Sequence, residues 1–132
     1  MALISVTRLR VRSVWFLPGF FYYALRSNAQ ARSAPGNLGV AVLNGAHRTF
    51  WTKSGWQDEA AMRAFLLAEP HKTAMKKLAE WCDEAAVVRW PQGSSVLPDW
   101  REAHRRMVAE GRKSRVRHPS AAHEAFQIPA PR

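Results

Sequence analysis

His71 is the one histidine of this chain that falls on an apolar helical stripe. Met75, Leu78 and Cys82 follow it at intervals of three or four residues, which is the spacing of one face of an α-helix. An imidazole on such a face can ligate a haem iron, act as a general base or hydrogen-bond a substrate. The alternative is a core histidine bonded to a backbone carbonyl, or a helix-end residue half in water. His71 is therefore the candidate catalytic residue and the candidate ligand of a haem iron.

Large apolar side chains near this histidine could form the wall of a pocket for a flat apolar molecule or a porphyrin. An ordinary hydrophobic core is the alternative. The candidate pocket residues are Phe50, Trp51, Trp56, Phe65, Met75 and Trp81. Arg48 and Arg89, near the ends of predicted strands, could bind a carboxylate or a haem propionate, whereas solvated arginines are the alternative.

The remaining reactive side chains lack the spacing of a known site. Cys82 is the single cysteine, and Asp83 and Glu84 beside it would not activate a thiol, so we expect it to pack inertly. The other histidines do not have the spacing of a closed metal site. No phosphate-binding glycine loop, nucleophile elbow or paired-carboxylate motif occurs. A single cysteine without a signal peptide favours a cytoplasmic location.

The net charge of +10 is unevenly distributed, with seven Lys or Arg and no acidic residue before Asp58. Nucleic acid is a frequent partner of such a chain. However, Arg8, Arg10 and Arg12 alternate along a predicted strand, and no nucleic-acid motif accompanies them. We therefore expect a solvated strand face. An anionic small molecule or, less favoured, nucleic acid remains the alternative partner.

The elements that would position His71 follow from hydrophobic periodicity and turn signals. Strands are predicted over 3–12, 37–43, 47–56 and 85–90, with Asn44-Gly45 as a hairpin turn. Helices are predicted over 17–32, from Asp58 to about Pro70, and over 71–82. The order β-α-β-β-α-β, with its second helix broken at Pro70, is the ferredoxin-like α+β arrangement.

One apolar run within the first helix, residues 14–25, could be mistaken for a membrane segment. It has only 12 residues, is interrupted by Pro18-Gly19 and lacks a cleavage pattern, so it is too short to span a bilayer. We expect a buried amphipathic helix and no membrane partner. An interfacial membrane helix is the alternative.

The composition changes after the last predicted strand, which divides the chain into residues 1–92 and 93–132. Residues 91–98 form a linker, and 99–109 a short helix with Asp99 and Glu102 in capping-box positions. Residues 112–132 are basic and then rich in proline and alanine, so we expect an extended or mobile tail.

The predicted strands have apolar residues on both faces, while a ferredoxin-like sheet has helices on one face only. Phe50 and Trp56 lie on one register and Trp51 on the other. Both faces therefore need cover, and an identical subunit is the simplest cover for the second face. This predicts a homodimeric α+β barrel. The C-terminal helix could instead be a lid, or an arm that reaches across the partner.

Segment 56–65, WQDEAAMRAF, together with Pro70-His71 and segment 79–85, AEWCDEA, resembles a known family. It is similar to the spheroidene-monooxygenase-like branch of the dimeric α+β barrel superfamily, which also includes antibiotic biosynthesis monooxygenases. The resemblance covers about residues 4–90. It implies a bacterial, monooxygenase-like oxidoreductase, cofactor-free or haem-dependent, that acts on an apolar and potentially anionic small molecule in a barrel cavity. It also places a histidine at position 71. A non-catalytic barrel that binds a small ligand or haem is the alternative.

Overall fold

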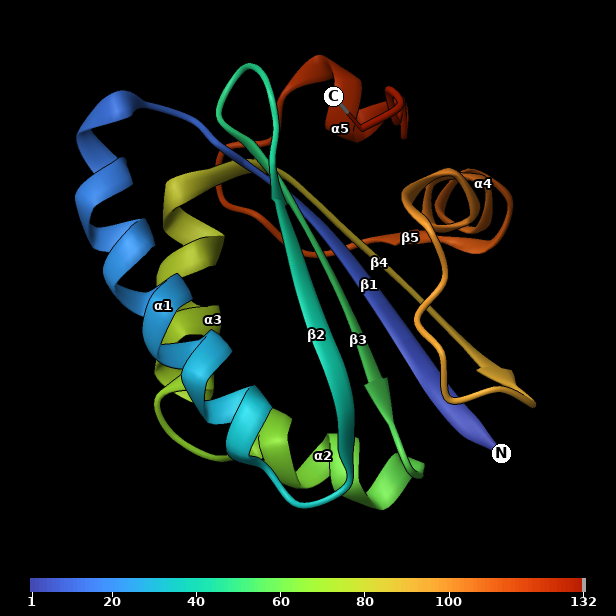
Figure 1. Ribbon diagram of the computed structural model, residues 1–132. Coiled ribbons are helices and arrows are strands. Elements are labelled where there is room, and N and C mark those ends of the chain that lie inside the picture. The colour runs from blue at the N-terminus through green and yellow to red at the C-terminus, as the bar shows by residue number, and fades with distance from the viewer. Residues whose placement is uncertain (132) are drawn as a thin grey trace.

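A five-stranded antiparallel sheet is the centre of the computed structural model, which describes residues 1–131 (Figure 1). Its strands are β1 (Ala2–Val11), β2 (Asn37–Asn44), β3 (Thr49–Trp56), β4 (Cys82–Gln92) and β5 (Arg112–Lys113). They lie in the order β2-β3-β1-β4-β5. The first four give the ferredoxin-like order that the sequence predicts, and β5 adds an edge strand.

Helices cover both faces of this sheet (Figure 1). On one face lie α1 (Leu17–Ser33), α2 (Glu59–Leu67) and α3 (His71–Trp81), with a short 3-10 helix, η1 (Val14–Phe16), before α1. On the other face lies α4 (Trp100–Glu110), and α5 (Ala121–Glu124) follows near the C-terminus. The predicted N-caps are confirmed, since Asp58 accepts a hydrogen bond from Ala61 N and Asp99 from Glu102 N.

The alternation predicted for the first strand is confirmed in β1. Ile4 and Val6 point towards α4, whereas Leu9 and Val11 point towards α1 and α3. In α1 the inward stripe consists of Phe20, Ala24, Ser27 and Ala31. Leu25, in contrast, is 68% exposed on the outer side.

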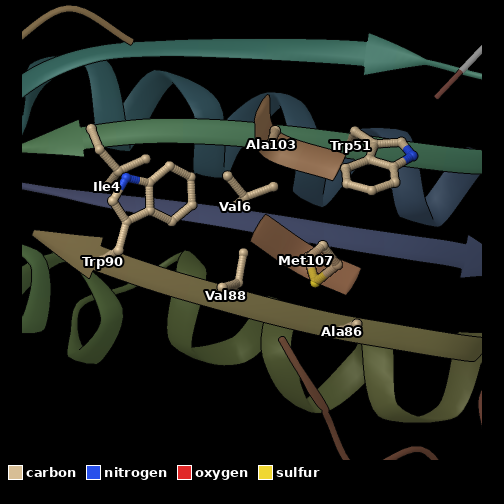
Figure 2. Close-up of a cluster of buried hydrophobic side chains, with 8 residues drawn as sticks. All are labelled: Ile4, Val6, Trp51, Ala86, Val88, Trp90, Ala103 and Met107. Atoms are coloured by element: carbon tan, nitrogen blue, oxygen red, sulfur yellow. The ribbon is translucent and has the colours of Figure 1, made fainter. Parts of the chain in front are cut away.

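The face of the sheet opposite α1 is covered by the chain itself (Figure 2). Ala103 and Met107 of α4, both fully buried, pack on one apolar cluster of the sheet. Its members are Ile4, Val6, Trp51, Ala86, Val88 and Trp90. Helix α4 is thus the C-terminal lid that the sequence offered as the alternative to an identical subunit. Because α4 covers the second face of the sheet, the physical basis on which the sequence predicted a homodimer is removed.

The hairpin of β2 and β3 is confirmed, but its turn is not a two-residue Asn-Gly turn. Four residues, 45–48, connect the strands, and Gly45 N–H donates to Thr49 O at 2.7 Å. The left-handed residues are His47 and Arg48, with φ of 59° and 58°. The Asn44-Gly45 signal therefore located the hairpin and misplaced its turn by about two residues.

The tail expected to be extended or mobile is instead folded against β4 and α3. After β5 pairs with β4, the backbone N–H groups of Ser114, Arg117 and Ser120 donate to carbonyls of Ala85, Ala79 and Asp83 at 2.9–3.0 Å. The physical reason is the free edge of β4, whose unpaired carbonyls the tail satisfies. Proline-rich and basic composition alone does not reveal such a partner.

The solvated strand face predicted for Arg8, Arg10 and Arg12 is also wrong. The Arg8 side chain is 5% exposed, and its Nη1 lies 2.8 Å from Oε1 of Glu84. Arg10 Nη1 lies 2.9 Å from Oδ2 of Asp83, and Arg12 pairs with Glu80. The carboxylates on and beside β4 thus neutralise these arginines and permit their burial.

Candidate functional site

The sheet surface that faces α1–α3 has a polar centre between two apolar ends. One end is the cluster that contains Trp56 and Met62, and the other contains Phe20 and Phe50. Between them the strand register aligns two rows, Ser54–Ser5–Arg89 and Thr52–Thr7–Val87. The hydroxyl residues of these rows are only half-buried. The helices therefore lie over hydrogen-bonding groups rather than a continuous apolar core.

Two polar side chains lie on the inward sides of the helices that cover this face. Ser27 lies on the inward stripe of α1, and its Oγ is buried without a hydrogen-bond partner. His71 is the first residue of α3, on the stripe that continues through the buried Ala74 to Leu78. A buried hydroxyl without a partner is costly. The position of Ser27 is therefore suited to hydrogen-bond a bound molecule.

His71 is held where α1, α2 and α3 meet. Its ring centroid lies 4.5 Å from that of Phe65, and Nδ1 lies 3.5 Å from the carbonyl oxygen of Leu66. Its backbone N–H donates to Gln30 Oε1 at 3.0 Å, while Gln30 Nε2 donates to Phe65 O at 3.2 Å. Gln30 thus satisfies an orphan donor at the start of α3, and it also bonds a carbonyl near the end of α2 that accepts from Ala68 N as well.

The electrostatics of the site favour a neutral imidazole. Burial lowers the pKa of His71 below its usual 6.5, the Leu66 carbonyl partly opposes this, and the positive charge of Arg89 lowers the pKa further. With Nδ1–H directed to the Leu66 carbonyl, the lone pair of Nε2 can accept a proton. Partial burial and the neighbouring charge of Arg112 lower the pKa of Arg89, against the attraction of Glu59. Arg89 still stays protonated at neutral pH.

An apolar groove of about 590 Å³ adjoins this site between the end of α1 and α2. Its volume is in the range of small-molecule sites. It is lined by Gln30, Ser33, Ala34, Pro35, Gly36, Gln57, Ala60, Ala61, Ala64, Phe65, Ala68 and Glu69. Gln30 and Phe65 belong both to the groove and to the surroundings of His71. The groove therefore borders the surroundings of His71 through these two residues.

Part of the predicted site is brought together around this imidazole. Trp56 stacks on Phe65 with ring centroids 5.1 Å apart, Phe65 contacts His71, and the charge of Arg89 acts on His71. Sequence reasoning missed Ser27 and Gln30. The signal for both was a polar residue on or beside the inward stripe of an otherwise apolar helix.

The other predicted residues lie elsewhere. Trp51 is on the α4 face, because neighbouring strand residues point to opposite sides. Phe50 and Trp81 pack at the far end of α1, on Phe20 and on Phe16 and Tyr23. Met75 is 51% exposed, and Arg48 Nε donates to Val11 O at 2.9 Å. These five do not share a pocket with His71.

The residues around His71 also bear on whether a metal ion or haem could bind. Within residues 1–131 no three His, Cys, Asp or Glu side chains are arranged to hold a metal ion. The His71 ring packs on Phe65 and its Nδ1 lies beside the Leu66 carbonyl, so only Nε2 would be free to ligate a haem iron. Burial, with the charge of Asp83, raises the pKa of Cys82 to about 12, which confirms an inert thiol.

Replacing Ser27 by alanine is expected to raise the free energy of unfolding by roughly 0.5–1 kcal/mol, because it removes an unpaired buried hydroxyl and favours the helix. Urea unfolding measures the change. Ser33→Ala is the matched control, since the Ser33 hydroxyl is exposed and donates to Ala29 O. A loss of stability in Ser27→Ala would show that the hydroxyl has a partner in the folded protein.

Comparison with known proteins agrees with this architecture. A model of the antibiotic biosynthesis monooxygenase family matches residues 17–77. A variant of SnoaB from Streptomyces nogalater, described as a cofactor-independent oxygenase, has a TM-score of 0.60 and 17% identity, covering 74% of this chain and 98% of that one. A putative antibiotic biosynthesis monooxygenase from Nitrosomonas europaea has a TM-score of 0.62 and 16% identity, covering 70% and 90%.

A conserved protein from Methanosarcina mazei Go1 is similar at a TM-score of 0.62 and 15% identity, over 70% of this chain and 93% of its own. No relative was found among curated protein sequences. At these identities the structural likeness establishes the fold, while the matched segment includes α1, α2 and the start of α3 with His71. Over residues 17–77 the chain is therefore similar to the antibiotic biosynthesis monooxygenase family, and its fold is that of the solved structures named above.

Proposed function

We propose that this protein is a monooxygenase-like oxidoreductase that acts without haem on an apolar small molecule carrying an anionic group. The observation that carries the proposal is the position of His71. Its imidazole, whose pKa is lowered by burial and by the charge of Arg89, packs on Phe65, which also lines the apolar groove. A base beside an apolar groove and a cationic side chain suits a substrate that has an apolar body and an anionic group.

The groove and Arg89 would recognise different parts of such a substrate. The groove offers alanine side chains and the Phe65 ring to an apolar body. Arg89 offers a guanidinium, and Arg112 of the edge strand lies close enough to lower its pKa, so the field there is positive. The Ser27 hydroxyl above the sheet supplies a further hydrogen-bonding group.

In this proposal His71 acts as the general base. It takes a proton from an acidic C–H of the substrate, and the resulting anion is electron-rich enough to react with molecular oxygen. Protonation and loss of water then complete the conversion R₂CH₂ + O₂ → R₂C=O + H₂O, which needs no further reductant. The positive charge of Arg89 stabilises the substrate anion. The family match and the description of SnoaB as a cofactor-independent oxygenase support this reaction class.

An oxygen electrode tests the reaction directly. The probe is a polycyclic hydroxyaromatic carboxylic acid with an activated CH₂ group, compared with its methyl ester. Under ¹⁸O₂ the ketone product should gain one labelled oxygen atom. Binding of the probe without oxygen uptake would favour the alternative, a non-catalytic ligand-binding protein. A Soret band that forms with haemin and is lost in His71→Ala would support haem dependence against the proposal.

Arg89→Gln is expected to raise the KM for the acid probe roughly tenfold or more, because it removes the cation that pairs with the carboxylate. The KM for the methyl ester should change little. Arg101→Gln, an exposed arginine on the opposite side of the molecule, is the control. Equal effects of Arg89→Gln on acid and ester would contradict an anion-binding role for this residue.

A further inference from the structure

Helix α1 has apolar side chains on two opposite faces. Phe20, Ala24 and Ala31 pack on the sheet. On the opposite side, spaced three or four residues apart, lie Pro18, Tyr22, Leu25 and Ala29. All four are exposed, with Tyr22 at 53% and Leu25 at 68%. The outer side of α1 therefore exposes a stripe of apolar side chains in addition to the stripe that packs on the sheet.

The apolar surface continues past the start of α1 into η1. Trp15 is 85% exposed and Val14 is 57% exposed. An indole exposed to this extent is costly in water, and tryptophan is enriched where one side of a protein meets the headgroups of a membrane. Trp15 thus lies in the short helix that directly precedes α1, whose outer side carries the exposed stripe.

A basic surface borders these apolar groups. Helix α3 packs beside α1 in the same layer (Figure 1). Three lysines of α3 are exposed, Lys72, Lys76 and Lys77. Lys72 and Lys76 are four residues apart and therefore lie on one side of the helix. Arg26 lies on α1 itself, with its guanidinium Nη1 bonded to the Tyr22 hydroxyl at 2.8 Å. Aromatic and aliphatic groups flanked by lysine and arginine are the composition of an interfacial membrane surface.

We propose that this outer surface of η1, α1 and α3 binds the surface of an anionic lipid bilayer. The surface consists of Val14, Trp15, Tyr22, Leu25, Arg26, Lys72 and Lys76. The protein lies on the bilayer and does not cross it, since no helix within residues 1–131 is long and apolar enough to span one. The sequence favoured a buried helix over residues 14–25, and the exposure of Trp15 and Leu25 favours its alternative.

Charge decides between a bilayer and a second copy of the chain. The surface defined above carries three basic side chains, Arg26, Lys72 and Lys76, and no acidic one. A symmetric dimer through this surface would bring the basic side chains of both copies together without a carboxylate of the same surface between them. An anionic bilayer instead attracts each basic side chain near its surface. The inference does not depend on the proposed reaction.

Co-sedimentation with vesicles tests the proposal. The full chain should bind vesicles of equal parts phosphatidylcholine and phosphatidylglycerol, and bind pure phosphatidylcholine vesicles at least tenfold more weakly. Trp15→Ser/Leu25→Ser should reduce binding to the mixed vesicles about tenfold or more, because it removes the apolar anchors. Val96→Ser/Val108→Ser is the matched control, with two valines that are 73% and 54% exposed outside this surface.

Lys72→Gln/Lys76→Gln should also weaken binding to the mixed vesicles about tenfold, and 1 M salt should have a similar effect. Circular dichroism melting confirms that each variant folds, as expected of exposed positions. Equal binding by Trp15→Ser/Leu25→Ser and by the control would overturn the proposal. Absence of vesicle binding would also overturn the proposal. Sedimentation velocity would then show whether the wild-type protein forms a dimer that Trp15→Ser/Leu25→Ser disrupts, which would mean that a second copy covers the surface.

Discussion

Glu84→Ala is expected to lower the free energy of unfolding by about 3–5 kcal/mol, because it leaves the charge of Arg8 buried without its partner. The two side chains are 5% and 8% exposed, and Arg8 Nη1 lies 2.8 Å from Glu84 Oε1. Glu84 Oε2 also accepts hydrogen bonds from the Ser120 hydroxyl and Arg10. Arg8 Nε already lacks a partner, so the loss of Glu84 cannot be compensated locally. Chemical denaturation measures the effect.

Glu59→Ala is the control, since its ion pair with Arg63 lies on the surface with both side chains about 70% exposed, and such pairs contribute little. A similarly small change in Glu84→Ala would contradict the assigned role of the buried pair.

Stability should depend on pH through the same carboxylate. Burial alone would raise the pKa of Glu84, but hydrogen bonding and charge from Arg8, then Ser120 and Arg10, outweigh it and lower the pKa below 4.5. A carboxylate with a lowered pKa stabilises the fold above its unfolded-state pKa and loses that contribution as the pH falls through the folded-state pKa. The wild-type protein should therefore lose stability below about pH 4.5, and Glu84→Ala should lose less over that window.

The elements of this fold were predictable wherever one physical period dominated. The alternation of Ile4 and Val6 against Leu9 and Val11 indicated β1, and both registers were correct. The α2 start was indicated by Asp58, whose carboxylate caps the helix. Both signals come from residues close together in the sequence, and each determines the structure only of the element that contains it.

The features that the sequence could not indicate depend on contacts between residues that are far apart in the chain. Arg8 and Glu84 are 76 residues apart, so burial of the arginine was invisible until the register of β1 and β4 was known. The lid has the same origin, since Met107 on α4 is buried only because the sheet presents Trp51 and Val88 to it. Composition of the linker and tail gives no information on such docking.

The candidate site was predicted in part for a similar reason. The helical stripe indicated His71, and aromatic density indicated Phe65 and Trp56. In the structure Phe65 contacts both His71 and Trp56, whereas Met75 of the same predicted stripe is 51% exposed. Trp51 could have been excluded from the sequence, because it lies an odd number of residues from Trp56 on one strand and must face the other side. The orphan hydroxyl of Ser27 required the helix to be docked before its burial was visible.

His71→Gln is expected to lower kcat for oxygen uptake by about 100- to 10,000-fold, the usual loss when a general base is removed. Glutamine keeps a polar side chain and the backbone N–H that donates to Gln30, so the start of α3 should be unchanged. His118→Gln is the matched control, with a side chain 54% exposed on the tail. Steady-state oxygen consumption and thermal melting separate a loss of catalysis from a loss of folding.

The pH profile distinguishes a base from a positioning role. Because the pKa of His71 is lowered, kcat/KM in the wild type should be constant at neutral pH and fall along an acidic limb below 6.5. The charge of Arg89 contributes to that lowering, so Arg89→Gln should move the acidic limb to higher pH. The control Arg101→Gln should leave the limb in place. An acidic limb that does not move in Arg89→Gln, or that persists in the residual activity of His71→Gln, would assign the titration to another group. The base would then have to be sought elsewhere in the groove or among the substrate's own acidic groups.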